Sequence, residues 1–134
     1  MLNLMVASDH VRSRIDRICA DFGITHGQYN VLRILRGIYP EGHPRCEIAV
    51  RMLEKAPDVT RLVDRLEAQE LVERDRSEED RRLSLTRITK KGLTLLDEMA
   101  PRFRDVQTYF SERVSRRDAR ELTRICEGLY AEED

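Results

Sequence analysis

Arginines between residues 57 and 66 carry the best-defined chemistry in this sequence. An apolar stripe at helical spacing predicts a buried face, formed by Val59, Leu62, Val63 and Leu66. The opposite face carries Thr60, Arg61 and Arg65. Guanidinium and hydroxyl groups placed in this way can donate to phosphates or base edges of DNA. A solvated helix face, with Arg61 paired to Asp58 or Asp64, explains the same pattern, and both interpretations stay open at this point.

A second set of charges lies in the turn from Ser77 to Arg82, with Arg76 directly before it. A narrow minor groove concentrates negative potential and attracts a guanidinium such as that of Arg82. Asp80 could hold Arg82 extended, and Arg76 and Arg81 add nearby positive charge. The alternative is a charged hairpin tip that only keeps a strand edge from pairing with other chains.

The chain offers no pattern typical of catalysis or of metal binding. His10, His26 and His43 are isolated from one another, and neither a phosphate-binding loop nor a dinucleotide-binding glycine motif is present. Ser8, Asp9 and His10 are only sequence neighbours, whereas a catalytic triad is assembled in space. We therefore predict a protein that is not an enzyme and that needs no cofactor or metal.

The cysteines and the composition indicate the class of protein. Cys19, Cys46 and Cys126 are widely separated, which argues against a disulfide framework and favours a reducing cytoplasm. We expect neither an export signal nor a membrane span. Charged residues make up 37% of the 134 residues and the net charge is −1, so overall charge does not reveal nucleic-acid binding.

The elements that must position these residues follow from periodicity and capping. We predict a helix over 4–22 that Gly23 ends, a helix that Thr25 and Gln28 open with a capping box, and a loop over 39–44. A short helix around Ile48 comes next, and another helix begins at Pro57 with Asp58 at its positive end. Strands over 71–76 and 83–89 flank the charged turn. A helix over 90–112, capped by Thr89 and kinked at Pro101, precedes a last helix capped by Ser115.

Several blocks of sequence carry a family resemblance. They are Gly23-Ile24-Thr25, the segment QYNVLRIL at 28–35, VTRLVDRLE at 59–67, LVER at 71–74, Asp80-Arg81-Arg82 and ITKKG at 88–92. In this order they resemble the MarR (multiple antibiotic resistance regulator) family. The fold class that the resemblance implies is mainly α with a small β-hairpin wing: a winged helix-turn-helix over about 24–89, and a helical dimerisation lobe from about 1–22 and 93–134, within one domain.

The resemblance also implies a function and its residues. It predicts a homodimer that binds a pseudo-palindromic operator in double-stranded DNA and acts as a repressor released by a small effector. The DNA-binding residues would be Pro57, Asp58, Thr60, Arg61, Arg65, Arg76, Asp80, Arg81 and Arg82. A small aromatic anion would bind near His10, Arg14, Tyr29 and Tyr39, because related proteins bind phenolic anions near the first helix.

Two alternatives and two departures from the family pattern accompany this prediction. A winged-helix protein–protein module without DNA binding would fit the nearly equal numbers of basic and acidic residues over 45–92. A redox-sensing regulator could use Cys19, although a buried cysteine also acts as a small apolar residue.

Glu70 stands where the family usually has glycine, which predicts strain if the turn needs a positive φ. Thr86 replaces an aliphatic strand residue.

Overall fold

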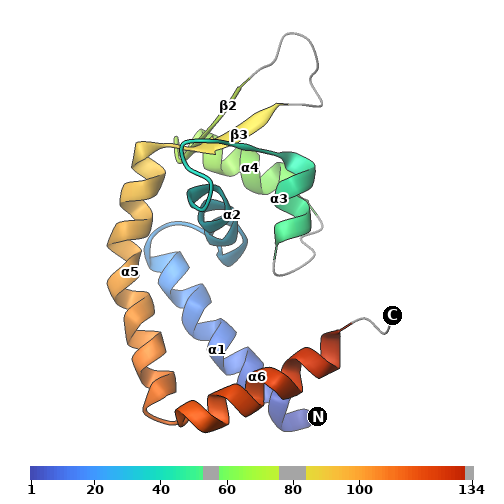
Figure 1. Cartoon of the computed structure of the whole chain (residues 1–134). Coiled ribbons are helices and arrows are strands. Elements are labelled where there is room, and N and C mark those ends of the chain that lie inside the picture. Colours follow the sequence, from blue (N-terminus) through green and yellow to red (C-terminus); the bar gives the residue numbers. More distant parts are fainter. Residues whose placement is uncertain (53–57, 76–83, 132–134) are drawn as a thin grey trace.

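The computed structural model of the chain describes residues 1–52, 58–75 and 84–131. Six helices and three short strands follow one another in these residues (Figure 1). Their bounds are α1 Leu2–Asp21, α2 His26–Arg36, β1 His43–Pro44, α3 Arg45–Arg51, α4 Val59–Ala68, β2 Val72–Arg74, β3 Leu85–Ile88, α5 Lys90–Ser111 and α6 Arg116–Tyr130. This order confirms the predicted winged helix-turn-helix with additional helices from both ends of the chain. Among the described helices, none has the length and apolar character needed to cross a membrane.

Side-chain caps open the helices where the sequence predicts them. The Thr25 hydroxyl accepts a hydrogen bond from the Gln28 amide, and Gln28 Oε1 accepts one from the Thr25 amide, which completes the capping box. Thr89 accepts from the Gly92 amide at the start of α5, and Ser115 accepts from the Asp118 amide at the start of α6. These bonds satisfy amides that lack partners in the first helical turn. Helix α5 continues beyond Pro101 to Ser111.

The small sheet contains a strand that the sequence analysis missed. The strand order is β1-β3-β2 and both pairings are antiparallel. His43 and Pro44 form β1 opposite Thr86 and Leu85, whereas the sequence predicts a loop over 39–44. A two-residue strand has no alternating apolar pattern to detect, and proline is tolerated there because β1 is an edge strand. The two predicted strands are shorter in the described residues than expected.

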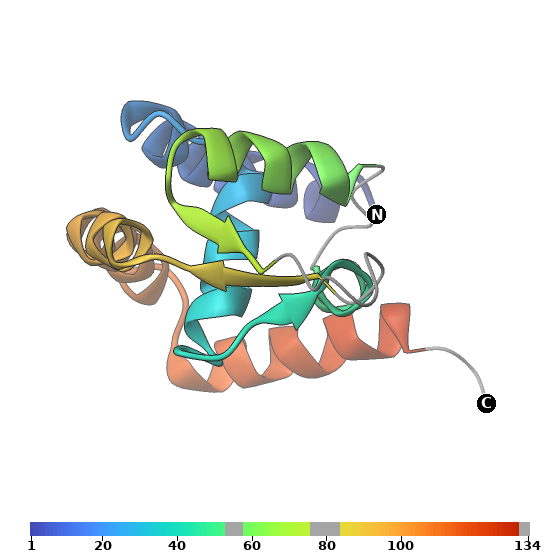
Figure 2. The ribbon, with the colours of Figure 1, turned by 90° about the horizontal axis from the view of Figure 1, so that it is seen from above.

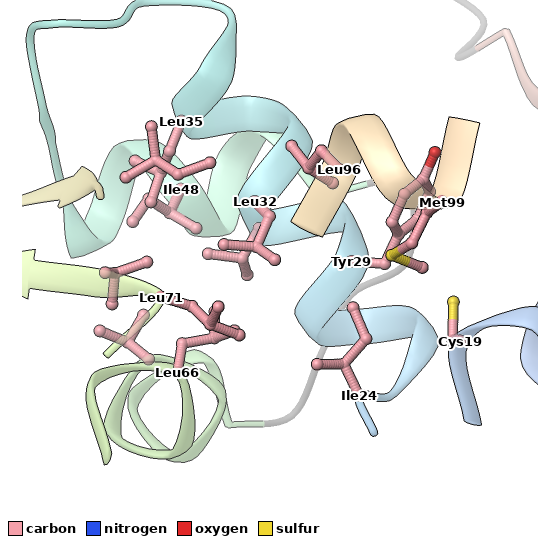
Figure 3. Close-up of a cluster of buried hydrophobic side chains, with 14 of the residues drawn as sticks. Cys19, Ile24, Tyr29, Leu32, Leu35, Ile48, Leu66, Leu71, Leu96 and Met99 are labelled. Atoms are coloured by element: carbon pink, nitrogen blue, oxygen red, sulfur yellow. The ribbon is translucent and has the colours of Figure 1, made fainter. Parts of the chain in front are cut away.

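The hydrophobic core lies around α2, where α3 and α4 of the winged helix-turn-helix meet the long helix α5 (Figure 3). The largest fully buried side chains are Leu32, Leu35, Ile48, Leu66 and Met99. They come from α2, α3, α4 and α5, so burial of these side chains holds the winged helix-turn-helix and the long helix α5 together. The core therefore fixes the orientation of α4 relative to α5.

The terminal helices have little cover from their own chain. Helix α1 packs along α5 but buries only Ile18 and Cys19, near its C-terminal end. Helix α6 buries no residue at all. The two helices cross in Figure 1, but Figure 2 shows them on opposite sides of the molecule. Exposed apolar side chains on these helices include Leu2, Met5, Val6, Ile125, Leu129 and Tyr130.

The turn after α4 has a positive φ at Glu70, where the family usually has glycine. Glu70 has φ 61°, in the left-handed region. The Glu70 amide donates to the Glu67 carbonyl and the Leu71 amide donates to the Leu66 carbonyl, which is the hydrogen-bond pattern of a Schellman motif. A left-handed conformation costs a residue with a Cβ roughly 1–2 kcal/mol. Glu70 is therefore strained.

Replacing Glu70 by glycine should stabilise the protein by about 0.5–1 kcal/mol. The free energy gained by relieving the strained φ exceeds the extra entropic cost of ordering glycine, which is more mobile in the unfolded chain. The Glu70–Lys91 ion pair, 3.4 Å long with both side chains exposed, contributes little. Urea unfolding at one fixed protein concentration measures the difference. Glu70→Ala is the control because it removes the ion pair but keeps the strain, and an equal gain in both variants would contradict the explanation.

Candidate nucleic-acid interface

Helix α4 begins two residues later than the sequence analysis predicts. Asp58 has the non-helical φ of −150° and is the N-cap, so the first helical residue is Val59 rather than Pro57. The Asp58 carboxylate accepts a hydrogen bond from the Arg61 amide at 3.1 Å. An aspartate N-cap satisfies a helix amide and favours the positive end of the helix dipole, which explains the shift. Val59, Val63 and Leu66 are buried, so Arg61 and Arg65 lie on the outward face.

The two arginines of this face have different surroundings. The Arg61 side chain is 78% exposed, and its Nε lies 3.2 Å from the second carboxylate oxygen of Asp58. Arg65 is also exposed, and it makes no ion pair within the part of the chain that the structure describes. Arg65 is therefore the more available cation of the two, whereas Arg61 must share its charge with Asp58.

Two contacts of α4 connect it to its neighbours in the winged helix. Arg45, at the start of α3, donates from Nη1 to the Thr60 hydroxyl at 2.9 Å. Arg74 of β2 pairs with Asp64, and its Nε lies 3.0 Å from Glu67 Oε2. The predicted partnership of Asp64 with Arg61 is therefore replaced by a contact with Arg74. Arg45 and Arg74 were missed because such contacts between distant segments leave no local pattern in the sequence.

The predicted DNA-binding residues of the wing, Arg76, Asp80, Arg81 and Arg82, all lie outside the described residues. Pro57, predicted at the start of the recognition helix, lies outside them as well, so the contacts of these five residues with DNA stay predictions. At the base of the wing, Arg87 pairs with Asp75, and the Ser84 hydroxyl donates to the Asp75 carbonyl at 2.8 Å. These contacts hold the ends of β2 and β3 together below the turn.

A separate cluster forms around the predicted effector residues His10 and Arg14. Arg14 Nε donates to His10 Nε2 at 3.2 Å, as their spacing of four residues on a helix allows. The Arg14 guanidinium lies 3.7 Å from the ring centre of Tyr109, and the Arg113 guanidinium lies equally close. The Tyr109 hydroxyl is 3.4 Å from His10 Nε2. Cation–π contact thus joins α1 to α5.

The other two predicted effector residues do not join this cluster. Tyr29 is buried and stacks on Phe103, with ring centres 4.4 Å apart. Tyr39 is 46% exposed and follows α2. Among the described residues, the contacts of His10 and Arg14 include neither tyrosine. Tyr109 is instead the aromatic residue beside Arg14. The two are 95 residues apart in the chain, so no local pattern in the sequence predicts their contact.

A pocket beside the cluster has a mainly positive rim. It has a volume of about 170 Å³ and is lined by Arg14, Arg17, Ile18, Arg102, Asp105 and Val106. Three arginines and one aspartate line the pocket, and Arg102 also pairs with Asp21 outside the lining, so a net positive charge remains that favours an anion. Pockets that bind drug-sized ligands usually measure about 300–1,000 Å³, so this pocket suits a smaller molecule.

Cys19 lies at the inner end of α1, where it is fully buried. Burial raises the pKa of the Cys19 thiol to about 11, and the nearby Asp16 carboxylate adds to the rise. The reactive form of cysteine is the thiolate, so a raised pKa makes this thiol a poor nucleophile at neutral pH. Cys19 therefore fits the small apolar role better than redox sensing. No cluster of metal-ligating side chains is found among the described residues.

Comparisons with known proteins agree with this geometry. The family model described as MarR family matches residues 24–84. The HTH-type transcriptional regulator MhqR of Bacillus subtilis (strain 168) is 33% identical over 95 residues, which span 70% of this chain and 61% of MhqR. The crystal structure of a MarR transcription factor from Planctomyces limnophilus is 35% identical, with a TM-score of 0.75 over 94% of this chain and 91% of that one.

A third comparison concerns the fold. The structure of the S. aureus MepR–DNA complex superposes with a TM-score of 0.84 at 19% identity, covering 97% of this chain and 95% of that one. The fold is thus shared along nearly the whole chain, and MhqR and the Planctomyces limnophilus protein are similar in sequence as well. The chain belongs to the MarR family of DNA-binding transcriptional regulators.

Proposed function

We propose that this protein is a homodimeric repressor that binds a pseudo-palindromic DNA operator through α4 and is released by a small anion. The outward face of α4, with Arg61 and Arg65 opposite a buried apolar stripe, is the observation that carries the proposal. A helix of this kind fits the major groove, where arginine donates to guanine O6 and N7. Arg82 would contact the minor groove from the wing tip.

Exposed cations on and beside α4 support DNA binding. Asp58, Asp64 and Glu67 would repel phosphates, but Arg61 pairs with the first and Arg74 with the other two. Arg65 stays exposed, and Arg45 stands beside Thr60 at the start of the helix. Arg61 and Arg74 thus offset two of these three carboxylate charges, which leaves Arg65 and Arg45 as the cations nearest to the groove-facing surface.

The exposed apolar side chains of the terminal helices support a dimer. Leu122, Ile125 and Leu129 repeat at helical spacing on α6, with exposed fractions of 38%, 47% and 68%. An isolated helix with this pattern gains little from its own chain, because α6 buries no residue there. A second copy, which presents the same face, would cover it in a two-fold arrangement.

Selection from random duplex DNA with the purified protein tests the proposal. We expect enrichment of an inverted repeat whose half-sites lie about one helical turn apart, 10–10.5 base pairs. Binding to the selected duplex should weaken steeply as salt concentration rises, because phosphate contacts release counterions. Failure to enrich any sequence, with binding to a protein partner instead, would favour the protein–protein module.

The pocket between α1 and α5 is the proposed effector site. We expect an aromatic carboxylate such as salicylate to lower operator affinity by about 5-fold or more, within the usual range of coupling between two sites. Arg14→Ala should remove this response without weakening DNA binding in the absence of salicylate, because Arg14 lines the pocket and lies on α1.

DNA titrations with and without salicylate measure the response. Arg113→Ala is the matched control, because Arg113 also contacts Tyr109 but does not line the pocket. A normal response in Arg14→Ala would contradict the anion pocket. Release of DNA by mild peroxide alone, lost in Cys19→Ser, would instead support redox sensing.

A further inference from the structure

Gln69 occupies an unusual position at the end of the helix that we propose contacts DNA. It is the C-cap residue of α4, and both ends of its side-chain amide have partners. Nε2 donates to the Gly23 carbonyl at 3.0 Å, and Oε1 accepts from Gln28 Nε2 at 3.3 Å. Both partners are more than 40 residues away, at the junction of α1 and α2. One side chain thus joins α4 to that junction.

The atoms that Gln69 contacts are themselves held firmly. Gly23 has φ 76°, and its amide donates to the Ala20 carbonyl while the Ile24 amide donates to the Cys19 carbonyl. This Schellman motif fixes the Gly23 carbonyl to the last turn of α1. Gln28 is 3% exposed, and its Oε1 is held by the Thr25 amide at 2.8 Å. A movement of α1 would therefore displace the partners of Gln69.

The α1 side of the junction connects to the proposed dimer lobe. Asp21, the last residue of α1, pairs with Arg102 of α5 at 2.9 Å. Other side-chain contacts of α4 run to α3 through Thr60 and to β2 through Asp64 and Glu67. These contacts stay within the winged helix. The contact of Gln69 with Gly23 reaches the end of α1 instead.

We propose that Gln69 is a positioning residue for DNA recognition, which ties α4 to the end of α1 and so helps to set the distance between the two α4 helices of a dimer. The proposal rests on the proposed function, since it needs a dimer that contacts DNA through α4. The Gln69–Gly23 bond is exposed and the Gln28–Gln69 bond is half-buried, so the net energy of each is modest. The core holds the rest of α4, so losing these bonds loosens only its C-terminal end and does not unfold the domain. Spacing selectivity is therefore more sensitive to their loss than folding is.

Operators with altered spacing provide the test. One inserted base pair moves a half-site by about 3.4 Å and turns it by roughly 35° about the DNA axis. Wild-type protein should therefore bind the duplex that it selects from a random library at least about 10-fold more tightly than versions with one base pair added or removed. In Gln69→Glu the carboxylate still accepts from Gln28 but cannot donate to Gly23, and the preference should fall to about 3-fold or less.

Two further variants separate positioning from stability. Gln69→Ala removes both hydrogen bonds without adding charge, so it tests the proposal even if Gln69→Glu folds poorly. Ile48→Val is the matched control, since it weakens the buried core without touching this contact. We expect Gln69→Ala to lose the spacing preference and Ile48→Val to keep it. A preference that survives in both Gln69 variants, or an affinity loss equal at every spacing, would overturn the proposal. If the wild-type protein selects no duplex, the proposed function fails instead.

Discussion

Replacing Ile125 by aspartate should split the dimer and lower operator affinity by about 10²–10⁴-fold. Ile125 is 47% exposed at the centre of the apolar face of α6, between Leu122 and Leu129. A carboxylate there would have to be buried without a partner in the two-fold contact, which costs far more than the contact gains. A monomer then binds each half-site separately and loses the effective concentration that joins them.

Sedimentation and DNA titration measure the two consequences together. Arg120→Asp is the control, because it adds a carboxylate to the opposite side of α6, where Arg120 is exposed. We expect this variant to remain a dimer and to bind the operator with nearly the wild-type affinity, apart from a small effect of the changed charge. If Ile125→Asp sediments as a dimer and keeps its affinity, α6 does not form the subunit contact.

Local signals in the sequence predicted most helix boundaries correctly. Thr25, Thr89 and Ser115 each cap a helix as expected, because capping depends on residues within one turn of the chain. Strain at Glu70 was expected if the turn needed a positive φ, because the resembling family usually has glycine there, and Glu70 does have a positive φ. These features need no knowledge of the rest of the fold.

The features that sequence analysis missed depend on contacts between distant segments. Strand β1 exists because His43 and Pro44 lie against β3, and no local preference predicts it. Asp64 pairs with Arg74 across the helix–strand junction rather than with Arg61, its neighbour in the helix. Helical periodicity shows which residues share a face, but it does not show which element covers that face.

The dependence on long-range contacts also explains where prediction and structure differ at the DNA-binding face and at the effector pocket. Arg61 and Arg65 were placed correctly on the exposed face of α4, because the apolar stripe defines the opposite face. Tyr29 was expected beside an effector, but its ring stacks on Phe103 in the interior. Tyr109 takes its place beside Arg14, through the packing of α1 on α5. Long-range packing thus decides which aromatic residue contacts Arg14.

Replacing Arg65 by alanine should weaken operator binding by at least roughly 30-fold. An arginine that contacts a base edge contributes about 1–3 kcal/mol, and a symmetric dimer makes the contact twice. The lower value gives about 2 kcal/mol for the whole dimer, which corresponds to roughly 30-fold in affinity. Because Arg65 is exposed and has no ion pair among the described residues, its removal should leave folding intact.

Arg61→Ala provides a comparison for the loss of operator affinity in Arg65→Ala. Arg61 pairs with Asp58, so DNA must compete with that carboxylate, and its removal should cost less affinity than the removal of Arg65. Titrations against the selected operator and its single-base variants measure both effects. Loss of preference at one position in each half-site would identify Arg65 as a base contact. An equal loss on every sequence, with a smaller salt dependence, would make Arg65 a phosphate contact. Unchanged affinity in Arg65→Ala would exclude this face of α4 from the DNA interface.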